Sequence, residues 1–238
     1  MDFHSISMNC NRAEFVGTAV LDTIGLVISG VDEKLLQKMN VGEKYRALGV
    51  YSSRTGAAGQ LTALDEAVKS TDTEVLSIEF PRDTKGWGGH GNYVVLGGNS
   101  PSDVRRAIKT ALELTDKYAG ELYISDAGHL EFAYTASAGK VLQKAFGAKA
   151  SQAFGFLAGS PAAIGLVMAD HAMKAADTEI VNYMTPDHGT RHSNEVILAF
   201  SGKADAVRSA VLSARQIGLE LLISMGSYPV VPGTSYLG

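Results

Sequence analysis

The residues best suited to chemistry gather in one short segment, DHGTRHSNE, at residues 187–195. His188 and His192 are four residues apart, and on a helix this spacing would bring two imidazoles to one metal ion. Asp187 or Glu195 would then be a third ligand. The segment contains glycine and lies between two predicted strands, so helical geometry is not expected. A polar loop is the favoured interpretation, and a metal site is the alternative.

A second polar segment, PRDTKGWGGHGN at residues 81–92, holds four glycines and the only tryptophan. Its glycines invite comparison with phosphate-binding loops, but no GK[ST] follows and the segment leads into a predicted strand rather than a helix. A catalytic triad can be assembled only on paper from Ser160, His188 and Asp170, because no G-x-S-x-G motif supports it. Neither pattern predicts catalysis.

Composition narrows the class of protein. Of the 238 residues 45% are apolar and 19% are charged, and the net charge is −4 with no Lys/Arg run, so nucleic acid is not an expected partner. Cys10 is the only cysteine, which excludes an intrachain disulfide and suits a reducing cytoplasm. The first fifteen residues lack the pattern of a signal peptide. No apolar run approaches about 18 residues, so no membrane span is expected.

The elements expected to position these segments belong to an internal sequence repeat. Residues 61–81 align with residues 166–186 at a constant offset of 105. Identical pairs include Asp65, Ala67, Lys69, Asp72, Thr73, Glu74 and Pro81, which match Asp170, Ala172, Lys174, Asp177, Thr178, Glu179 and Pro186. Such a repeat predicts the same fold in both halves, so residues 20–120 and 128–226 should superpose.

Each half predicts a strand, a short helix, a strand, a long helix, two strands separated by one of the polar segments, and a last helix. In the second half Ser160 and Pro161 are the predicted cap and first residue of the long helix. ELYIS and ELLIS are expected to close the two copies. The fold class is therefore α+β, with helices on one face of a mainly antiparallel sheet, used twice over residues 14–125 and 126–238.

Several motifs resemble one family: EFVGTAVLDTIGLVI, SRTGA, DEAVKSTDTEVLSIEFPRDTKG, GHGN, AGHLEF, HGTRHSNE and VRSAVLSARQIG. They are similar to the tandem-domain shell proteins of bacterial microcompartments, of the propanediol- and ethanol-utilisation type, over residues 14–236. The resemblance implies two circularly permuted domains and a homotrimer of about 75 kDa that imitates a hexagonal tile. It implies association with other shell proteins in the bacterial cytoplasm, no enzymatic activity, no catalytic residue, no metal and no cofactor.

The resemblance also implies that the two polar segments line pores that pass small metabolites such as alcohols, diols or cofactors. The expected pore-lining residues are Arg82, Asp83, Lys85, Trp87, His90, Asn92, Asp187, His188, Thr190, Arg191, His192 and Asn194. The family tends to have a small residue where this chain has Trp87, so we expect the indole to close a gate at rest. The alternative is that Trp87 anchors the loop on its own domain and nothing opens.

The turns at residues 52–59 and 158–165 join a strand to a helix in each half. Tight connection is the favoured interpretation, and the functional one makes Arg54, Thr55 and Ser160 contacts to a neighbouring subunit or a small polyol. A duplicated small-molecule-binding or metal-dependent enzymatic module that uses the same loops is the alternative function. The organelle type, whether ethanol, propanediol, ethanolamine or glycerol, stays open.

Overall fold

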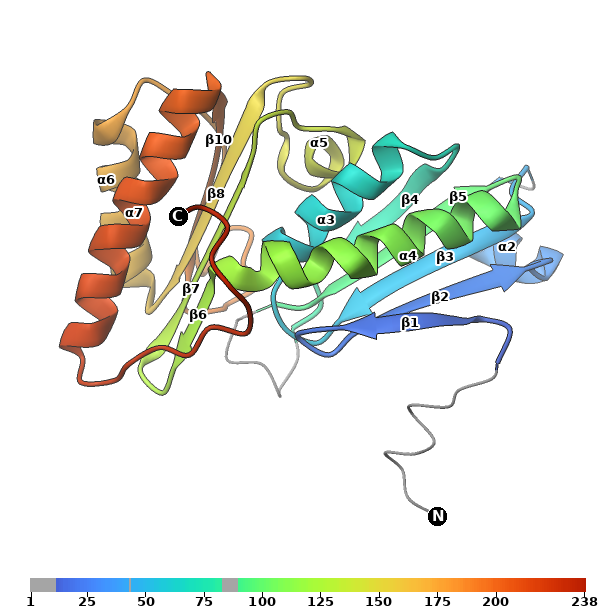
Figure 1. The fold of residues 1–238 in the computed structure, drawn as a ribbon, viewed down its shortest axis with the longest axis horizontal. Coiled ribbons are helices and arrows are strands. Elements are labelled where there is room, and N and C mark those ends of the chain that lie inside the picture. The colour runs from blue at the N-terminus through green and yellow to red at the C-terminus, as the bar shows by residue number, and fades with distance from the viewer. Residues whose placement is uncertain (1–11, 43, 83–89) are drawn as a thin grey trace, which may run out of the picture.

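The computed structural model describes residues 12–42, 44–82 and 90–238 (Figure 1). They form two five-stranded antiparallel sheets with the same strand order. The first sheet runs in the order β1 (Phe15–Ala19), β2 (Thr23–Ser29), β3 (Ala47–Ser53), β5 (Asn92–Gly98) and β4 (Glu74–Glu79). The second runs β6 (Leu122–Ser125), β7 (Gly128–Thr135), β8 (Ala153–Ser160), β10 (Val196–Gly202) and β9 (Glu179–Met184). The predicted duplication and the α+β class are confirmed.

The helices also follow one order in both halves. They are α2 (Glu33–Lys38), α3 (Ala58–Lys69), α4 (Pro101–Tyr118) and the short η1 (Ala119–Glu121), then α5 (Lys140–Phe146), α6 (Ala162–Ala175) and α7 (Ala204–Ser224). Helix α4 covers the first sheet with α3 packed beside it, and the pair α6 and α7 covers the second. Among the described residues, no helix combines the length and the hydropathy needed to cross a membrane.

The second sheet is covered on both faces, which differs from the expected single helical face. Strand residues alternate between faces: Phe154 and Phe156 of β8 pack with α3 and α5, whereas Leu157 packs toward α6 and α7. Figure 1 shows α3 and α5 side by side near this inner face. Residues of both halves therefore share one continuous core.

The motif ELYIS does not close the first copy as expected. Residues 122–125 form β6, which pairs with β7 and opens the second sheet, while residues 220–224 lie in α7. Nearly identical segments adopt different structures because tertiary contacts override local propensity: β6 has a strand to pair with, and Leu222 is buried in the helical core. The sheets thus divide before Leu122 rather than at residues 125 and 126.

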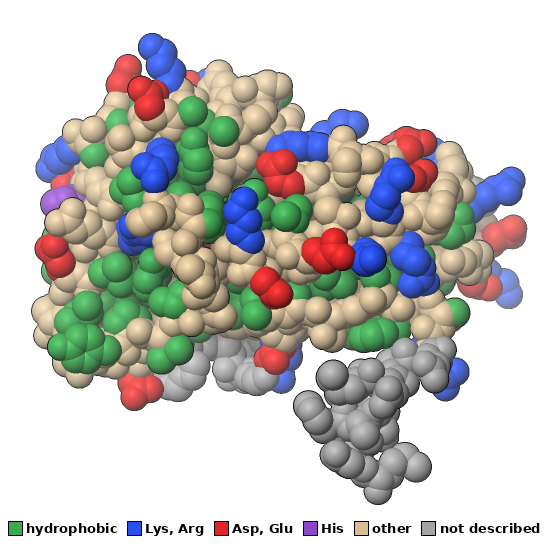
Figure 2. Space-filling model, in the orientation of Figure 1, with side chains coloured by type: hydrophobic (Ala, Val, Ile, Leu, Met, Phe, Trp, Pro, Cys, Tyr) green, Lys and Arg blue, Asp and Glu red, His purple; other side chains and the backbone are tan. Residues whose placement is uncertain are grey.

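Some apolar side chains stay on the surface. Over the C-terminal end of α7 and the chain that follows, Figure 2 shows a broad apolar patch, to which Met225, Tyr228 and Val230 contribute. A different exposed group lies on α6 and β9, and it comprises Leu166, Val167, Ile180 and Tyr183.

Candidate functional site

The polar segment DHGTRHSNE, at residues 187–195, lies in a tight turn between β9 and β10. Gly189, Arg191 and His192 have positive φ angles of 101°, 49° and 66°. Thr190 is fully buried and its hydroxyl donates to the carbonyl oxygens of Thr185 and Ser193, at 3.0 and 3.1 Å. This hydroxyl holds the turn together from the inside, where Ser193 is also buried.

Most of the expected pore-lining side chains in this turn are exposed: Asp187, His188, Arg191, His192 and Asn194. Arg82, exposed three residues after the end of β4, reaches the same turn and donates from Nη1 to the His192 carbonyl oxygen at 3.3 Å. The two polar segments of one chain therefore meet. Their role in lining a pore stays a prediction.

Three of the expected pore-lining residues have their side chains inside the molecule. His90 is 7% exposed, and Asn92 and Thr190 have no exposed surface. Such side chains cannot face a passage without leaving their partners, so these three positions are corrected to internal residues. Asp83, Lys85 and Trp87, with the expected gate, lie outside the described residues.

Asn194 has a structural task as well. Its Oδ1 accepts a hydrogen bond from the Ala162 backbone N–H at 3.1 Å, at the start of α6. The expected cap, Ser160, instead ends β8 opposite His129, and its side chain makes no capping bond to α6. A cap supplied by a residue 32 positions away cannot be recognised from local sequence.

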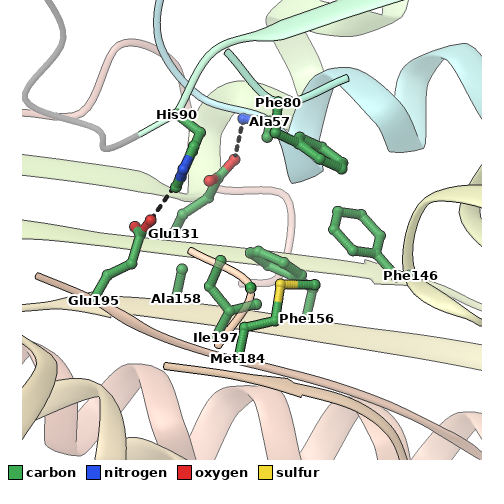
Figure 3. A pocket seen from close by; sticks show the side chains of 11 residues that line it. Ala57, Phe80, His90, Glu131, Phe146, Phe156, Ala158, Met184, Glu195 and Ile197 are labelled. Carbon is green, nitrogen blue, oxygen red and sulfur yellow. Dashed lines mark hydrogen bonds and ion pairs between the residues drawn. The ribbon is translucent and has the colours of Figure 1, made fainter. Parts of the chain in front are cut away.

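A buried carboxylate lies where the two halves of the chain meet (Figure 3). Glu195, the residue before β10, is 2% exposed, and its Oε2 lies 3.2 Å from Nε2 of His129 on β7. Its Oε1 lies 2.6 Å from Nδ1 of His90, although the ring N–H is not aligned with that oxygen. At this distance the contact acts as a charge interaction, which needs proximity more than alignment.

Burial alone would raise the pKa of Glu195. Hydrogen bonds and charge from His129 and His90 outweigh burial and lower this pKa to about 2. The ionised form is therefore the stable one, and it joins the first half of the chain, through His90, to the second.

A second buried carboxyl group closes the same junction from β7. Oε1 of Glu131 accepts hydrogen bonds from the backbone N–H groups of Ala57, Ala58 and Gly59, at 2.9, 2.8 and 3.4 Å. These are free donors at the N-terminus of α3, where the helix dipole favours a negative charge. Burial nevertheless raises the pKa of Glu131, with the three N–H groups acting against it.

Between these carboxyl groups lies a small cavity of about 30 Å³ (Figure 3). His90, Glu131 and Glu195 border it on one side, and Phe80, Phe146 and Phe156 are among its apolar walls. Its size suits about one water molecule rather than a substrate.

The turn after β3 borders a different hollow. Arg54 is exposed beside an open groove of about 630 Å³ that Asp22, Thr23 and Ser52 also line. Thr55 is half-buried and its hydroxyl has no protein partner among the described residues. The small-molecule role expected for Arg54, Thr55 and Ser160 stays a prediction.

The ionisable side chains of this junction stabilise the contact between the two halves of the chain, and their arrangement does not suggest catalysis. Glu195, which the sequence offered as a metal ligand beside His188 and His192, contacts His90 and His129 instead. Asp170, considered above as the acid of a Ser160–His188–Asp170 triad, forms an exposed ion pair with Lys174. The sequence analysis did not identify Glu131. A signal for it was present: the equivalent position of the repeat, in β2, holds the apolar residue Ile24, so a glutamate at this position is unusual.

Comparison with known proteins decides the family. The sequence profile of the BMC domain matches the chain twice, at residues 47–127 and 153–232. The chain belongs to the BMC domain family of bacterial microcompartment proteins. Both matches begin at the third strand of a sheet, β3 or β8, so two strands and a short helix precede each matched region.

Full-length relatives of this BMC protein are shell proteins. It is 51% identical over 229 residues to the bacterial microcompartment shell protein PduB of Citrobacter freundii, covering 96% of this chain and 85% of that one. PduB of Limosilactobacillus reuteri is 45% identical, with 94% of each chain covered. The BMC protein is therefore a structural shell protein, and catalysis is not its task.

Solved structures agree in fold. A crystal structure of a trimeric shell protein PduB superposes with a TM-score of 0.90 at 45% identity, covering 94% of this chain and all of the other. EtuB from Clostridium kluyveri gives 0.91 at 46% identity, with 94% and 99% covered.

Proposed function

We propose that the protein forms a closed ring of three chains, a pseudohexagonal tile in the shell of a microcompartment in the bacterial cytoplasm. The observation that supports it most is an interface that each chain forms once internally. The two equivalent surfaces, on α6 and on the first sheet, have no counterpart among the described residues of the same chain. Within a chain, α3 of the first half packs on the inner face of the second sheet. A second copy of this contact would join neighbouring chains.

The donor side of the repeated contact is α6, the counterpart of α3. Leu61 and Thr62 of α3 are fully buried, whereas the residues 105 positions later, Leu166 and Val167 of α6, are 54% and 39% exposed. An exposed Leu–Val pair at positions that the repeat buries elsewhere indicates a surface that awaits a partner.

The receiving side is the first sheet. Ile24 and Tyr93 are each 37% exposed on the face that carries α2. By strand register they correspond to Glu131 and Ile197 of the second sheet, which are 6% and 8% exposed. Docking α6 of one chain on this face of the next would cover both residues.

Head-to-tail contacts of this kind close a ring when the rotation between successive units divides a full turn. Six equivalent domains in three chains form such a ring, and the related PduB is described as trimeric. The proposed trimer has a mass of about 75 kDa, three times 25.1 kDa.

We further propose that the outward polar residues of the two meeting segments line openings for small metabolites. Arg82, Asp187, His188, Arg191 and His192 are exposed and carry charge or hydrogen-bonding groups. Side chains of this kind set what passes through a narrow opening. Association with other shell proteins follows from the same tile-like role.

Sedimentation and negative-stain electron microscopy test the proposal together. We expect a species of about 75 kDa, and at high concentration flat hexagonal arrays. A stable monomer at micromolar concentration, with no arrays, would contradict the ring.

A further inference from the structure

The N-terminus of α3 depends on the other half of the chain for its hydrogen bonds. The backbone N–H groups of Ala57, Ala58 and Gly59 all donate to Oε1 of the buried Glu131 on β7 (Figure 3). In the first half, no described residue accepts from these three groups, and Ala57 at the N-cap has no side-chain acceptor. A buried helix end without acceptors is costly, so α3 is complete only when the second sheet lies against it.

The N-terminus of α6, the counterpart of α3, finds its acceptors within its own half. The equivalent N–H groups, 105 positions later, belong to Ala162, Ala163 and Ile164. The Ala162 N–H donates to Oδ1 of Asn194 at 3.1 Å, and the Ile164 N–H donates to the Pro161 carbonyl oxygen at 2.9 Å. Two of the three equivalent donors are therefore occupied before another domain approaches.

The sheet faces that receive the two helices differ in a matching way. Strand register places Ile24 of β2 at the position that Glu131 holds in β7. In the ring proposed above, α6 of the neighbouring chain covers Ile24. An apolar side chain suits a helix end that has its own acceptors, and a carboxyl group suits one that needs them. A carboxyl oxygen accepts N–H bonds in either protonation state, so this match does not require a charge on Glu131.

Exchanging the two helices would leave unpaired polar groups at both sheet faces. Placed against Glu131, α6 would bring a helix end whose donors are mostly occupied. Placed against Ile24, α3 would turn three unpaired N–H groups toward an apolar side chain. Because buried polar groups without partners are costly, both wrong pairings are penalised, and such penalties are a source of specificity. They act before the contact between α3 and the second sheet closes, when that face is open to either helix.

We propose that Glu131, Ile24 and Asn194 determine which helix docks on which sheet, and thereby the order of the two halves around the ring. At the junction within a chain, the sheet supplies the acceptor for the helix end. At the junction between chains, the helix end is satisfied by its own half and the sheet offers an apolar side chain. The second assignment rests on the proposed ring, whereas the first lies within a single chain.

Moving the internal arrangement to the junction between chains tests the second assignment. Ile24→Glu should oppose assembly, because its carboxyl group would face an α6 whose donors are mostly occupied. Adding Asn194→Ala releases the Ala162 N–H, so the double variant should assemble again. In sedimentation, the protein concentration at half-assembly should rise about tenfold or more in Ile24→Glu and fall by about tenfold or more on adding Asn194→Ala.

Tyr93→Glu, alone and with Asn194→Ala, is the matched control. Tyr93 is on the same face and, like Ile24, is 37% exposed, but strand register places it at the position of Ile197 rather than Glu131. Its carboxyl group should weaken assembly, and Asn194→Ala should not restore it. Unimpaired assembly of Ile24→Glu, no recovery in its double variant, or equal recovery in the control pair would each overturn the second assignment.

Hydrogen–deuterium exchange of Glu131→Ile tests the first assignment without the ring. We expect the Ala58 and Gly59 amides to exchange about tenfold faster or more, and the Ile164 amide to exchange as in the unaltered protein. Glu131→Gln keeps an acceptor oxygen and should retain the protection. Unchanged protection in Glu131→Ile would overturn the role of Glu131.

The two measurements separate this inference from the proposed ring. A monomeric unaltered protein would overturn the ring and the assignment at Ile24, while exchange at α3 still decides the role of Glu131. If Glu131→Ile does not fold, exchange in Asn194→Ala replaces it. The Ala162 amide should then lose protection and the Ala58 amide should not, and equal changes at both would overturn the separate caps.

Discussion

Leu61 and Leu166 occupy equivalent positions in α3 and α6, yet Leu61 has no exposed surface and Leu166 is 54% exposed. The difference arises because α3 packs against the other half of its own chain, whereas among the described residues α6 packs chiefly with α7, β8 and β10 of its own half. Equivalent surfaces of the two copies are thus buried within the chain in the first copy and exposed in the second.

Leu166→Asp should abolish ring formation and leave the single chain folded. A carboxylate at an exposed position costs the monomer little, but burying it without a partner at an interface costs several kcal/mol. Sedimentation should shift from about 75 kDa toward 25.1 kDa. The matched control is Met225→Asp, which is also exposed, at 51%, but lies at the end of α7. Equal effects of the two variants would count against the proposed interface.

Asp65→Ala should destabilise the fold by about 3 kcal/mol. The buried Asp65 carboxylate accepts from the backbone N–H groups of Gly139, Val141 and Leu142, at 2.7, 3.0 and 3.2 Å, and so ties α3 to the start of α5. The equivalent change, Asp170→Ala, removes an exposed pair with Lys174 and should cost less than about 0.5 kcal/mol in the monomeric Leu166→Asp background. Urea unfolding measures both, and similar losses would show that the buried cap is not the cause.

Glu195→Gln should remove stability that depends on pH in acid. The folded pKa of Glu195, about 2, is lower than its ordinary value of 4.5, so this carboxylate stabilises the fold above pH 4.5 and its contribution is lost as the pH falls toward 2. The difference corresponds to about 3 kcal/mol, at about 1.4 kcal/mol for each tenfold change in proton affinity. As the pH is lowered through this range, the free energy of unfolding should fall less steeply in the variant than in the unaltered protein.

Glu131→Gln should act in the opposite pH range. Because the folded pKa of Glu131 is raised above 4.5, its favourable contribution is complete below pH 4.5 and is lost as the pH rises through the folded pKa. The unaltered protein should therefore lose stability relative to the glutamine variant as the pH rises from about 4.5. A constant difference between the two proteins over this range would argue against a protonated buried carboxyl group.

Arg191→Glu should change ion selectivity without changing assembly. Arg191 is exposed on a turn whose conformation depends on the buried Thr190, so its replacement should leave the turn intact. If the turn lines an opening, a negative ring in place of a positive one favours cations. The reversal potential of trimers in a planar bilayer under a salt gradient measures this, and an unchanged potential would remove Arg191 from the pore.

The repeat was the most informative feature of the sequence, because identical residues at one offset report a shared fold without any knowledge of contacts. It predicted the α+β class and the equivalent strand order. It could not predict that ELYIS forms a strand and ELLIS a helix, since the difference arises from β7, which pairs only with the former.

The buried site was harder to predict for a related reason. His90, His129 and Glu195 are far apart in the sequence, and only the packing of one sheet against the other half of the chain brings them together. Polar type and nearby glycines indicated surface loops, and this was right for His188 and His192 but wrong for His90 and Thr190.

The shared core gives the duplication an evolutionary consequence. Ile24 and Glu131 occupy one position of the repeat, but Glu131 faces the start of α3 in its own chain. If the proposed ring forms, a ring of six identical domains would place one residue type at this position of every junction, so any change there would be multiplied sixfold. Two copies in one chain release that constraint. An ionisable residue can then be accepted at one set of junctions while an apolar residue is kept at the other, and the two sets are free to drift apart under separate selection.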